Sequence, residues 1–263
     1  MKRVVQFSGG LASYFTALLV AERHGTEDMI LLFADVLIES ADLYRIMPTY
    51  AADVGAQFVR IADGRTPFEV FKDVRFIGNT QVDPCSEVLK RKLCRKWLED
   101  RFTPFSDALP GLVEQAILYV GITWDEGRED EIRERWKPWT VEFPLCDPPY
   151  LTKKDMIRMT LAKGLEVSRA YTEGFPHDNC GGGCVKAGIS QWVHLRKLRP
   201  EVYKMWMDGE ADAIREIGKD VAILRDRRGG VTKPMTLVEL EARILADDPM
   251  LPKYDWGGCG CGI

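Results

Sequence analysis

RVVQFSGGLASYFTALLVAERH, residues 3–24, is the stretch that decides how this chain is organised. Residues 3–7 are mostly apolar and β-prone, which predicts a short buried strand. Gly9 and Gly10 allow a tight turn and a close approach of the backbone to a ligand. Residues 14–24 then predict a helix. A strand, a glycine turn and a helix N-terminus make an anion site, because backbone amides and the positive end of the helix dipole face the ligand.

The turn also carries two hydroxyl groups, Ser8 and Ser13, either of which can cap the helix. It lacks the Gly-Lys-Ser/Thr of the usual phosphate loop and the Gly-x-Gly-x-x-Gly of dinucleotide-binding folds. Ser8-Gly9-Gly10-x-x-Ser13 instead resembles the pyrophosphate-binding loop of the PP-loop (N-type ATP pyrophosphatase) superfamily. The alternative is an ordinary strand-to-helix turn that contains glycines.

The resemblance implies that Ser8, Gly9, Gly10 and Ser13 hold the β,γ-phosphates of ATP and direct attack at the α-phosphate. Ala12 stands where these relatives usually carry Asp. Any Mg²⁺ on the triphosphate would therefore be held by other carboxylates or by water, since this ion prefers oxygen ligands.

The composition is that of a soluble globular enzyme, with 46% hydrophobic and 29% charged residues. The 263 residues suit one large domain, or one domain with a small appendage. We expect a cytoplasmic protein with no membrane partner, because the sequence shows no secretory signal and no apolar run of membrane-spanning length. The net charge of −4 argues against a generally basic nucleic-acid binder but permits a local basic patch.

Alternating strand and helix patterns predict an α/β fold, a doubly wound and mostly parallel sheet of about five strands with helices on both faces. Further strands are expected at residues 29–34, 57–61, 116–122 and 141–145, and helices at 41–54, 67–74, from 83 or 86 to 98, and 153–163. We expect residues 1–165 to form this nucleotide-binding domain. Residues 166–263 are predicted to form a Cys/Gly-rich helical region, with helices at 190–199, 202–207 and 237–245.

Polar residues follow several of these strands and predict the walls of a nucleotide pocket. Asp35 ends the second strand and so lies in range of a ligand bound beyond the carboxyl ends of the strands. Two segments carry a further resemblance: residues 85–90, with the pattern Cys-x-x-x-Leu-Lys, and residues 121–128, which follow a predicted strand. They resemble the phosphoadenosine-phosphosulfate (PAPS) reductase-like branch, also described as adenine nucleotide alpha hydrolase-like. The resemblance implies that Lys90 meets phosphate and that Gly121, Asp125, Glu126 and Arg128 border the pocket. Solvated loop carboxylates and a basic helix face are the alternatives.

Seven cysteines in a cytoplasmic chain are more typical of metal binding or catalysis than of disulfides. Cys180 and Cys184 lie four apart in a glycine-rich loop, a spacing that lets two thiolates reach one metal ion. Cys85 is the expected third ligand, at a helix start where the dipole favours a thiolate. Zinc and a [4Fe-4S] cluster both suit such ligands.

The fourth ligand is expected from the C-terminal tail, where glycines flank Cys259 and Cys261. Cys94 is a further candidate, and Cys146 is expected to be a small core residue. A loose tail with incidental cysteines is the alternative.

The loop at Ser8 and the segments 85–90, 121–128 and 180–184 occur in the order found in the family. This resemblance implies an ATP-using enzyme that adenylylates an acceptor and transfers sulfur to a nucleic acid or nucleotide. Its implied partners are an adenine nucleotide, a nucleic-acid acceptor and a sulfur-donor protein, and a homodimer is left open. A sulfonucleotide reductase with Cys261 as the attacking tail thiol is a second hypothesis. A third is a non-catalytic nucleotide-binding subunit of a modification complex, which Ala12 favours.

Overall fold

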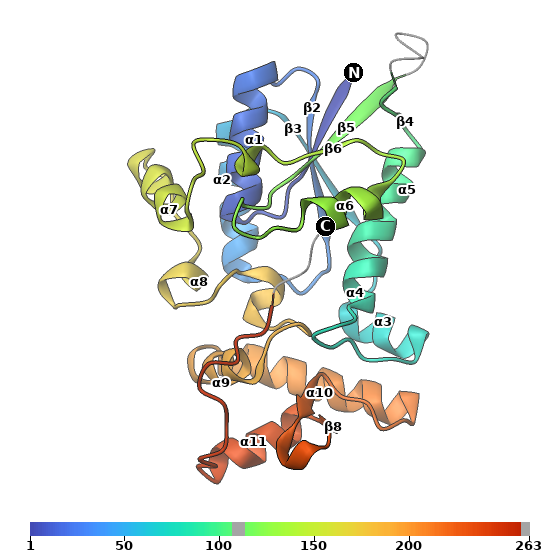
Figure 1. Ribbon diagram of the computed structural model, residues 1–263, viewed down its shortest axis with the longest axis vertical. Coiled ribbons are helices and arrows are strands. Elements are labelled where there is room, and N and C mark those ends of the chain that lie inside the picture. Colours follow the sequence, from blue (N-terminus) through green and yellow to red (C-terminus); the bar gives the residue numbers. More distant parts are fainter. Residues whose placement is uncertain (107–113, 259–263) are drawn as a thin grey trace.

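A parallel six-stranded sheet forms the centre of the computed structural model, which describes residues 1–106 and 114–258 (Figure 1). The strand order is β3–β2–β1–β5–β4, and β6 pairs with the later part of β5. All these strand pairs are parallel, which confirms the predicted α/β class. The strands are β1 (Lys2–Gln6), β2 (Met29–Asp35), β3 (Gln57–Ala62), β4 (Thr103–Pro104), β5 (Gln115–Val120) and β6 (Val141–Glu142).

Helices cover both faces of the sheet, so β2 and β5 are buried along their whole length. Val5 of β1 packs on the face covered by α1 (Leu11–His24), α2 (Ala41–Val54) and α7 (Lys153–Ala162). Val4 points the other way, toward α5 (Leu93–Glu99) and α6 (Glu129–Trp136). The alternation of apolar side chains along β1 therefore supplies two cores.

Three expected elements differ in detail. Helix α1 begins at Leu11, three residues before the predicted start, and its N-cap is Gly10, so neither serine caps it. The strand predicted over 141–145 ends at Glu142, because Pro144 opens a 3₁₀ turn (Pro144–Cys146) and has no amide for a ladder hydrogen bond. The helix around Lys90 is interrupted by a π-helical segment, Glu87–Lys92, between α4 (Pro84–Ser86) and α5. Such π segments are frequent at functional sites.

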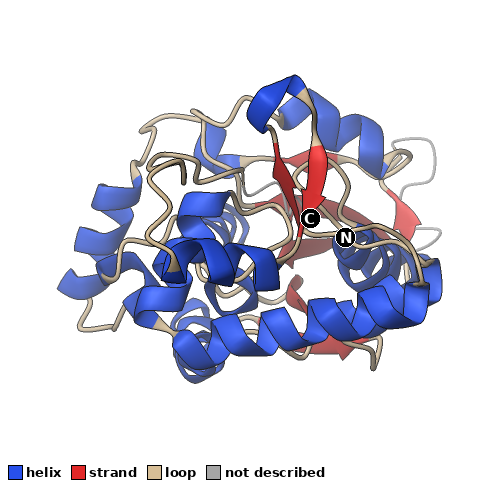
Figure 2. Cartoon of the chain, turned by 90° about the horizontal axis from the view of Figure 1, so that it is seen from below, coloured by secondary structure: helices blue, strands red, loops and turns tan. Residues whose placement is uncertain are grey.

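The C-terminal region is helical, as predicted, and lies below the sheet in Figure 1 and nearest the viewer in Figure 2. Trp192 and Trp206 lie in its core, where α3 (Pro67–Val74) packs against α10 (Pro200–Ile217). The helix predicted over 202–207 is part of an 18-residue helix. The elements are α3 (Pro67–Val74), α8 (Arg169–Thr172), α9 (Ile189–Leu198), α10 (Pro200–Ile217), β7 (Leu224–Asp226), β8 (Lys233–Met235) and α11 (Leu237–Leu245).

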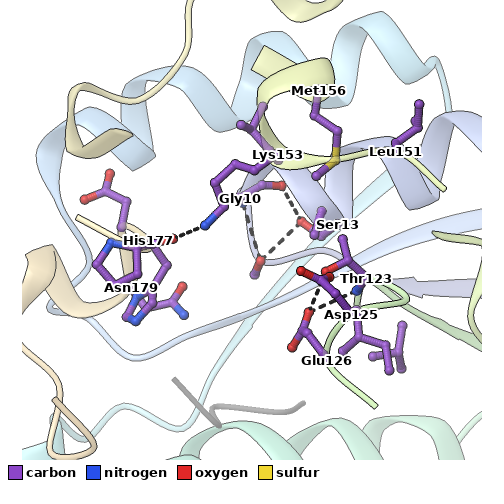
Figure 3. A pocket seen from close by; sticks show the side chains of 18 of the residues that line it. Gly10, Ser13, Thr123, Asp125, Glu126, Leu151, Lys153, Met156, His177 and Asn179 are labelled. Atoms are coloured by element: carbon purple, nitrogen blue, oxygen red, sulfur yellow. Dashed lines mark hydrogen bonds between the residues drawn. The ribbon is translucent and has the colours of Figure 1, made fainter. Parts of the chain in front are cut away.

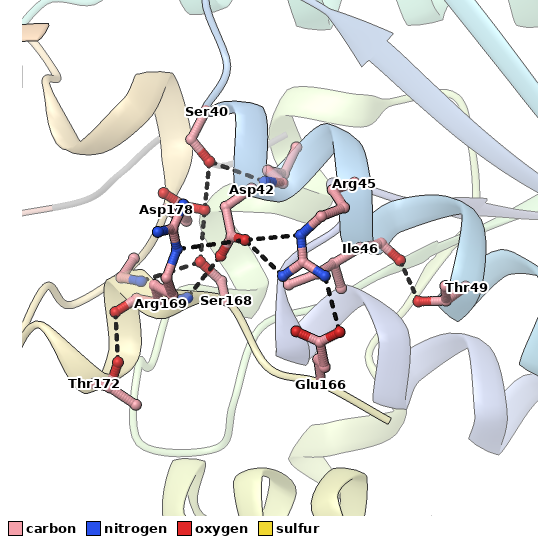
Figure 4. A network of polar contacts seen from close by, with 12 residues as sticks. Ser40, Asp42, Arg45, Ile46, Thr49, Glu166, Ser168, Arg169, Thr172 and Asp178 are labelled. Atoms are coloured by element: carbon pink, nitrogen blue, oxygen red, sulfur yellow. Dashed lines mark hydrogen bonds and ion pairs between the residues drawn. The ribbon is translucent and has the colours of Figure 1, made fainter. Parts of the chain in front are cut away.

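A buried polar network ties the start of α2 to residues 166–178 (Figure 4). Asp42 accepts a hydrogen bond from the Arg169 amide at 2.7 Å and from Arg45 at 2.7 Å. Burial alone would raise the pKa of Asp42, but these two donors lower it below its usual value. Asp178 accepts from the hydroxyls of Ser40 and Ser168, each at 2.6 Å. These bonds cross the predicted boundary at 165/166, and that division stays a prediction.

Within the described ranges, no helix combines the length and the apolar character that crossing a bilayer requires.

Candidate functional site

A cavity of about 370 Å³ opens beyond the carboxyl ends of β1 and β5 (Figure 3). The strand order changes direction between these two strands, which is where parallel α/β sheets bind ligands. We call this cavity the cleft. Most of its lining comes from four segments: the loop after β1, the loop after β5, the start of α7, and residues 176–179. Leu43, Lys90 and Tyr171 complete it.

The loop after β1 presents hydroxyls and amides to the cleft. The Ser8 hydroxyl donates to Ser13 Oγ at 3.2 Å, and the Ser13 hydroxyl donates to the Gly10 carbonyl at 2.9 Å. The Leu11 amide donates to the Tyr171 hydroxyl at 3.3 Å. In the part of the chain that the structure describes, no acceptor is present for the amides of Ala12 and Ser13. The N-terminus of α1 therefore presents an anion site.

Two of the predicted glycines serve the geometry of this loop. Gly121, at the end of β5, lies against it so closely that a Cβ would stand 2.7 Å from the Ser13 nitrogen. Gly9 has φ +78° and faces Met47 of α2, so it turns the chain and does not line the cleft. Gly10 lines the cleft beside Ser8 and Ser13.

The loop after β5 brings the predicted carboxylates to the opposite wall (Figure 3). Glu126 accepts a hydrogen bond from the Thr123 amide at 2.9 Å and pairs with Arg128. Asp125 makes no hydrogen bond or ion pair with any described residue and is exposed. Asp125 is therefore available to a ligand, whereas Glu126 and Arg128 already partner each other.

Lys153 and His177 also line the cleft, and the sequence analysis did not select them. Lys153, in the first turn of α7, reaches across to donate to the Pro176 carbonyl at 2.5 Å (Figure 3). The Nδ1 atom of His177 is buried with no described hydrogen-bond partner. Burial, and then the positive charge of Lys153, lower the pKa of His177 to about 4. A neutral imidazole thus faces the cleft at neutral pH.

Asp35 does not line the cleft. Its buried carboxylate accepts hydrogen bonds from the Tyr44 hydroxyl at 2.6 Å, the Leu37 amide at 2.8 Å and the Arg60 side chain at 2.8 Å. Asp35 is at the end of β2, as the sequence predicted. Its side chain, however, joins β2 to α2 and β3 and does not face the cleft.

Lys90 connects the cleft to a second cavity. It is buried, lines both cavities, and places its Nζ 3.3 Å from Glu39 Oε1. The other Glu39 oxygen accepts a hydrogen bond from the Cys180 amide. Glu39 was also missed by the sequence analysis, because no local pattern distinguishes it from a helix-flanking surface carboxylate. Glu39 thus links Lys90 to the cysteine loop.

The second cavity, which we call the cysteine cavity, is lined by Cys85, Cys180 and Cys184. It measures about 10 Å³, room for roughly one water molecule. Cys180 has φ +53°, in the left-handed region that non-glycine residues rarely adopt. Burial raises the pKa of the Cys85 thiol to about 12, with Cys184 and Asp83 adding to the shift. Without a metal ion, desolvation at Cys85 therefore outweighs the helix start and favours the neutral thiol, and its role as a ligand stays a prediction.

Three thiols around one cavity match the ligands of a thiophilic metal. Among residues 1–106 and 114–258, however, no group of three or more His, Cys, Asp or Glu side chains has the arrangement of a metal site. The predicted ligand Cys259 and the predicted tail nucleophile Cys261 lie outside the described residues. The last described residue, Gly258, donates its amide to the Lys186 carbonyl at 3.2 Å, two residues after Cys184.

Cys94 and Cys146 lie apart from the cysteine cavity. Cys94 is buried in the core between α5 and the sheet, where burial raises the pKa of its thiol to about 12. The Cys146 thiol donates to the Ile122 carbonyl at 3.7 Å and packs at the edge of the same core. Cys94 is therefore corrected from candidate ligand to core residue.

No protein-family model and no curated protein sequence matches the chain. Among solved structures, it is similar to the U34-tRNA thiolase NcsA from Methanococcus maripaludis, which carries a [4Fe-4S] cluster. The identity is 15%, the TM-score is 0.44, and the match covers 83% of this chain and 69% of that one. It is also similar to a phosphoadenylyl-sulfate (PAPS) reductase from Candida auris, solved as a phosphate complex. Here the identity is 11%, the TM-score is 0.43, and the match covers 66% of this chain and 79% of the other.

Both matches are likenesses of structure. At these identities the likeness concerns the fold alone, so the chemistry is argued below from the side chains of the cleft and of the cysteine cavity.

Proposed function

We propose that the protein is an ATP-binding PP-loop enzyme that adenylylates an acceptor, releases pyrophosphate and serves sulfur transfer to a nucleic acid or nucleotide. The supporting observation is the N-terminus of α1, whose Ala12 and Ser13 amides and two serine hydroxyls face a cleft of about 370 Å³. Such a terminus favours phosphate through its amides and its dipole. Leu151 and Met156 give the same cleft an apolar wall that suits a nucleobase.

In the proposed reaction an acceptor oxygen attacks the α-phosphate, and the bond from that phosphorus to the bridging oxygen breaks. Pyrophosphate leaves while the amides of the loop, Lys153 and Lys90 stabilise its negative charge. A sulfur nucleophile such as a persulfide then displaces AMP from the acceptor. Asp125 would hold Mg²⁺ on the triphosphate, because Ala12 offers no carboxylate within the loop. The ion would neutralise part of the charge of the triphosphate.

We further propose that Cys85, Cys180, Cys184 and Cys259 share one zinc ion or [4Fe-4S] cluster. The three described thiols line a single cavity, and Lys90 lies between that cavity and the cleft. With four thiolate ligands the centre would have no open position, so it would serve to hold the cysteine loop and the tail in place beside Lys90. Cys180→Ser should then lower the metal content of anaerobically purified protein, and Cys146→Ser should leave it unchanged. Full metal in both Cys85→Ser and Cys180→Ser would contradict the shared centre.

The nucleotide site is tested by replacing Ser8 and Ser13 with Ala together. Each lost charge-assisted hydrogen bond should weaken ATP binding by about 1–3 kcal/mol, as measured by calorimetry. Thr49→Ala is the matched control, because that exposed hydroxyl donates only to the Ile46 carbonyl of its own helix. Unchanged ATP affinity in the double variant would contradict the proposal that residues 8–13 bind phosphate.

The products separate the proposed reaction from its alternatives. AMP and pyrophosphate formed from ATP in the presence of an acceptor support adenylylation. Release of sulfite from a sulfonucleotide without ATP cleavage would indicate the reductase, in which Cys261 attacks the sulfur. Tight ATP binding with no turnover on any acceptor would indicate a nucleotide-binding subunit, as Ala12 suggests. The sulfur-donor protein and a homodimer remain proposals of the same kind.

A further inference from the structure

A third cavity, of about 490 Å³, lies in the C-terminal region and shares no lining residue with the cleft. The β7–β8 hairpin forms one wall, α11 contributes Arg243, and residues 250–257 close the other side. We call it the arginine cavity, because Arg225, Arg227, Arg228 and Arg243 all line it.

Two of these arginines are neutralised inside the protein. Arg243 pairs with Asp248 at 2.7 Å, and Arg228 pairs with Asp226 and Asp248. Even so, the Nη2 atom of Arg243 is buried and finds no acceptor among the described residues. One buried donor therefore remains unsatisfied beside the cavity.

The other two arginines carry charge that the described part of the chain does not balance. Neither Arg225, which is partly buried, nor Arg227, which is exposed, forms an ion pair with a described residue. Residues 224–235 contain four basic side chains and one acidic side chain, in a protein whose net charge is −4. The hairpin is thus a basic patch on an acidic chain, which favours an anionic ligand.

The segment that closes the other side also carries an aromatic ring that does not itself line the cavity. Tyr254 stands between Pro252 and Asp255, which line the cavity, and its side chain is 89% exposed. No described ring packs against it, whereas the neighbouring Trp256 ring packs on His194. Proteins hold single-stranded nucleic acid by combining exposed aromatic rings, which stack on bases, with cations that contact phosphates. Here the ring is on the segment that flanks the cavity, and the unbalanced guanidinium groups line the cavity itself.

The arginine cavity also adjoins the cysteine loop. Gly188 and Gly257 line it, and Ala187 pairs with Gly257 in an isolated antiparallel bridge. The Ala187 amide donates to the Cys184 carbonyl at 2.8 Å. One turn of chain therefore forms a wall of the arginine cavity and carries a thiol of the cysteine cavity.

We propose that the arginine cavity binds the phosphodiester backbone of an unpaired nucleic-acid segment, with Tyr254 stacking on a base. This inference rests on the proposed function only in naming where the acceptor docks. The unbalanced charges of Arg225 and Arg227 favour a polymer over a free nucleotide, and the ring of Tyr254 favours nucleic acid over an acidic peptide.

The test is fluorescence anisotropy of the full-length protein with a labelled single-stranded RNA of about 20 nucleotides, without ATP, between about 50 and 200 mM salt. A single-stranded DNA of the same sequence, measured in the same way, shows whether the cavity prefers RNA or DNA. Arg225→Glu/Arg227→Glu should weaken binding at least tenfold and lower the slope of log affinity against log salt by about 1.4, since two phosphate contacts are lost. The thermal midpoint should stay unchanged, because neither arginine forms an ion pair with a described residue.

Tyr254→Ala should weaken binding about tenfold without changing the salt slope, since stacking releases no counterions. The control is Lys92→Glu/Lys96→Glu, an equal charge change on exposed side chains of the sheet region, and it should bind normally. Equal loss in the control, no binding by the wild type, or equal binding of polyglutamate would overturn the proposal. The Ser8/Ser13 double variant should still bind RNA, so failure of the ATP site and failure of this site give different results.

Discussion

The loop at residues 8–13 and the loop at residues 180–184 are both glycine-rich, but their glycines serve opposite purposes. A Cβ on Gly10 would meet only ordinary contacts, 3.5 Å from Ser8 Oγ and from the Tyr171 hydroxyl. A Cβ on Gly183 would overlap the indole ring of Trp206. The first loop leaves its backbone open to a ligand, and the second lets its backbone pack onto a tryptophan core. Glycine content by itself does not distinguish the two.

The two regions also bury their ionisable groups in opposite ways. His177, at the cleft, has a pKa lowered to about 4 by burial and by Lys153. Glu210, in the C-terminal core, has a pKa raised to about 7 by burial, although the Ile223 and Leu237 amides both donate to it. Burial favours the neutral form of both side chains. The contribution of His177 to stability should therefore be lost in acid, and that of Glu210 should be lost as the pH rises.

The largest effect is expected for Gly183→Ala. The added methyl group must displace Trp206 or the loop, which should lower the free energy of unfolding by about 3 kcal/mol. Urea unfolding monitored by tryptophan fluorescence measures the loss. Gly258→Ala is the control, because a Cβ there meets nothing within 4 Å. Equal stability of the two variants would show that the loop at residues 180–184 is as open as the loop at residues 8–13.

The next effect is the pH dependence that Glu210 imposes. Below pH 4.5 its carboxyl is protonated in both states, so its stabilising contribution is complete. As the pH rises toward 7 the unfolded state ionises first, and stability falls by on the order of 3 kcal/mol. Glu210→Gln should remove this slope whatever its effect on overall stability, as urea titrations at several pH values would show. Exposed Glu201→Gln should keep it.

His177 should give a smaller slope of opposite sign, because its ring keeps some solvent contact. Its folded pKa lies below the usual histidine value of 6.5, so its contribution is complete above pH 6.5 and is lost as the pH falls toward 4. His177→Asn should flatten the acid limb of stability between those values. If the wild type and His177→Asn lose the same stability between pH 6.5 and 4, the imidazole is solvated. The contrast between the two regions would then not hold.

The smallest effect is expected for Ala12→Asp, which restores the carboxylate that related loops carry. It should tighten the binding of the magnesium–nucleotide complex or leave it unchanged, because Ala12 lines the cleft beside the free amides. Calorimetry with and without Mg²⁺ separates the metal from the nucleotide. A marked loss of affinity with Mg²⁺ would indicate a cleft that is not built for a magnesium complex.

Local patterns predicted most of the elements. The helices at 41–54 and 67–74 have the bounds expected from their apolar periodicity, and β2 begins and ends within one residue of its prediction. The loop at Ser8 reached the cleft because strand, turn and helix are consecutive in the chain. The anion site needed no distant partner to form.

The remaining site residues depended on contacts between distant segments. Glu39 meets Lys90 and the Cys180 amide, which are 51 and 141 positions away, and no local signal marks it. Asp35 was correctly placed at a strand end, but Arg60 and Tyr44 use its carboxylate. The sequence by itself determined the backbone elements and the helix terminus for an anion, because those follow from nearest-neighbour preferences. Only the tertiary structure decided which side chains face the cleft and which thiols are desolvated, because burial is set by segments that meet after folding.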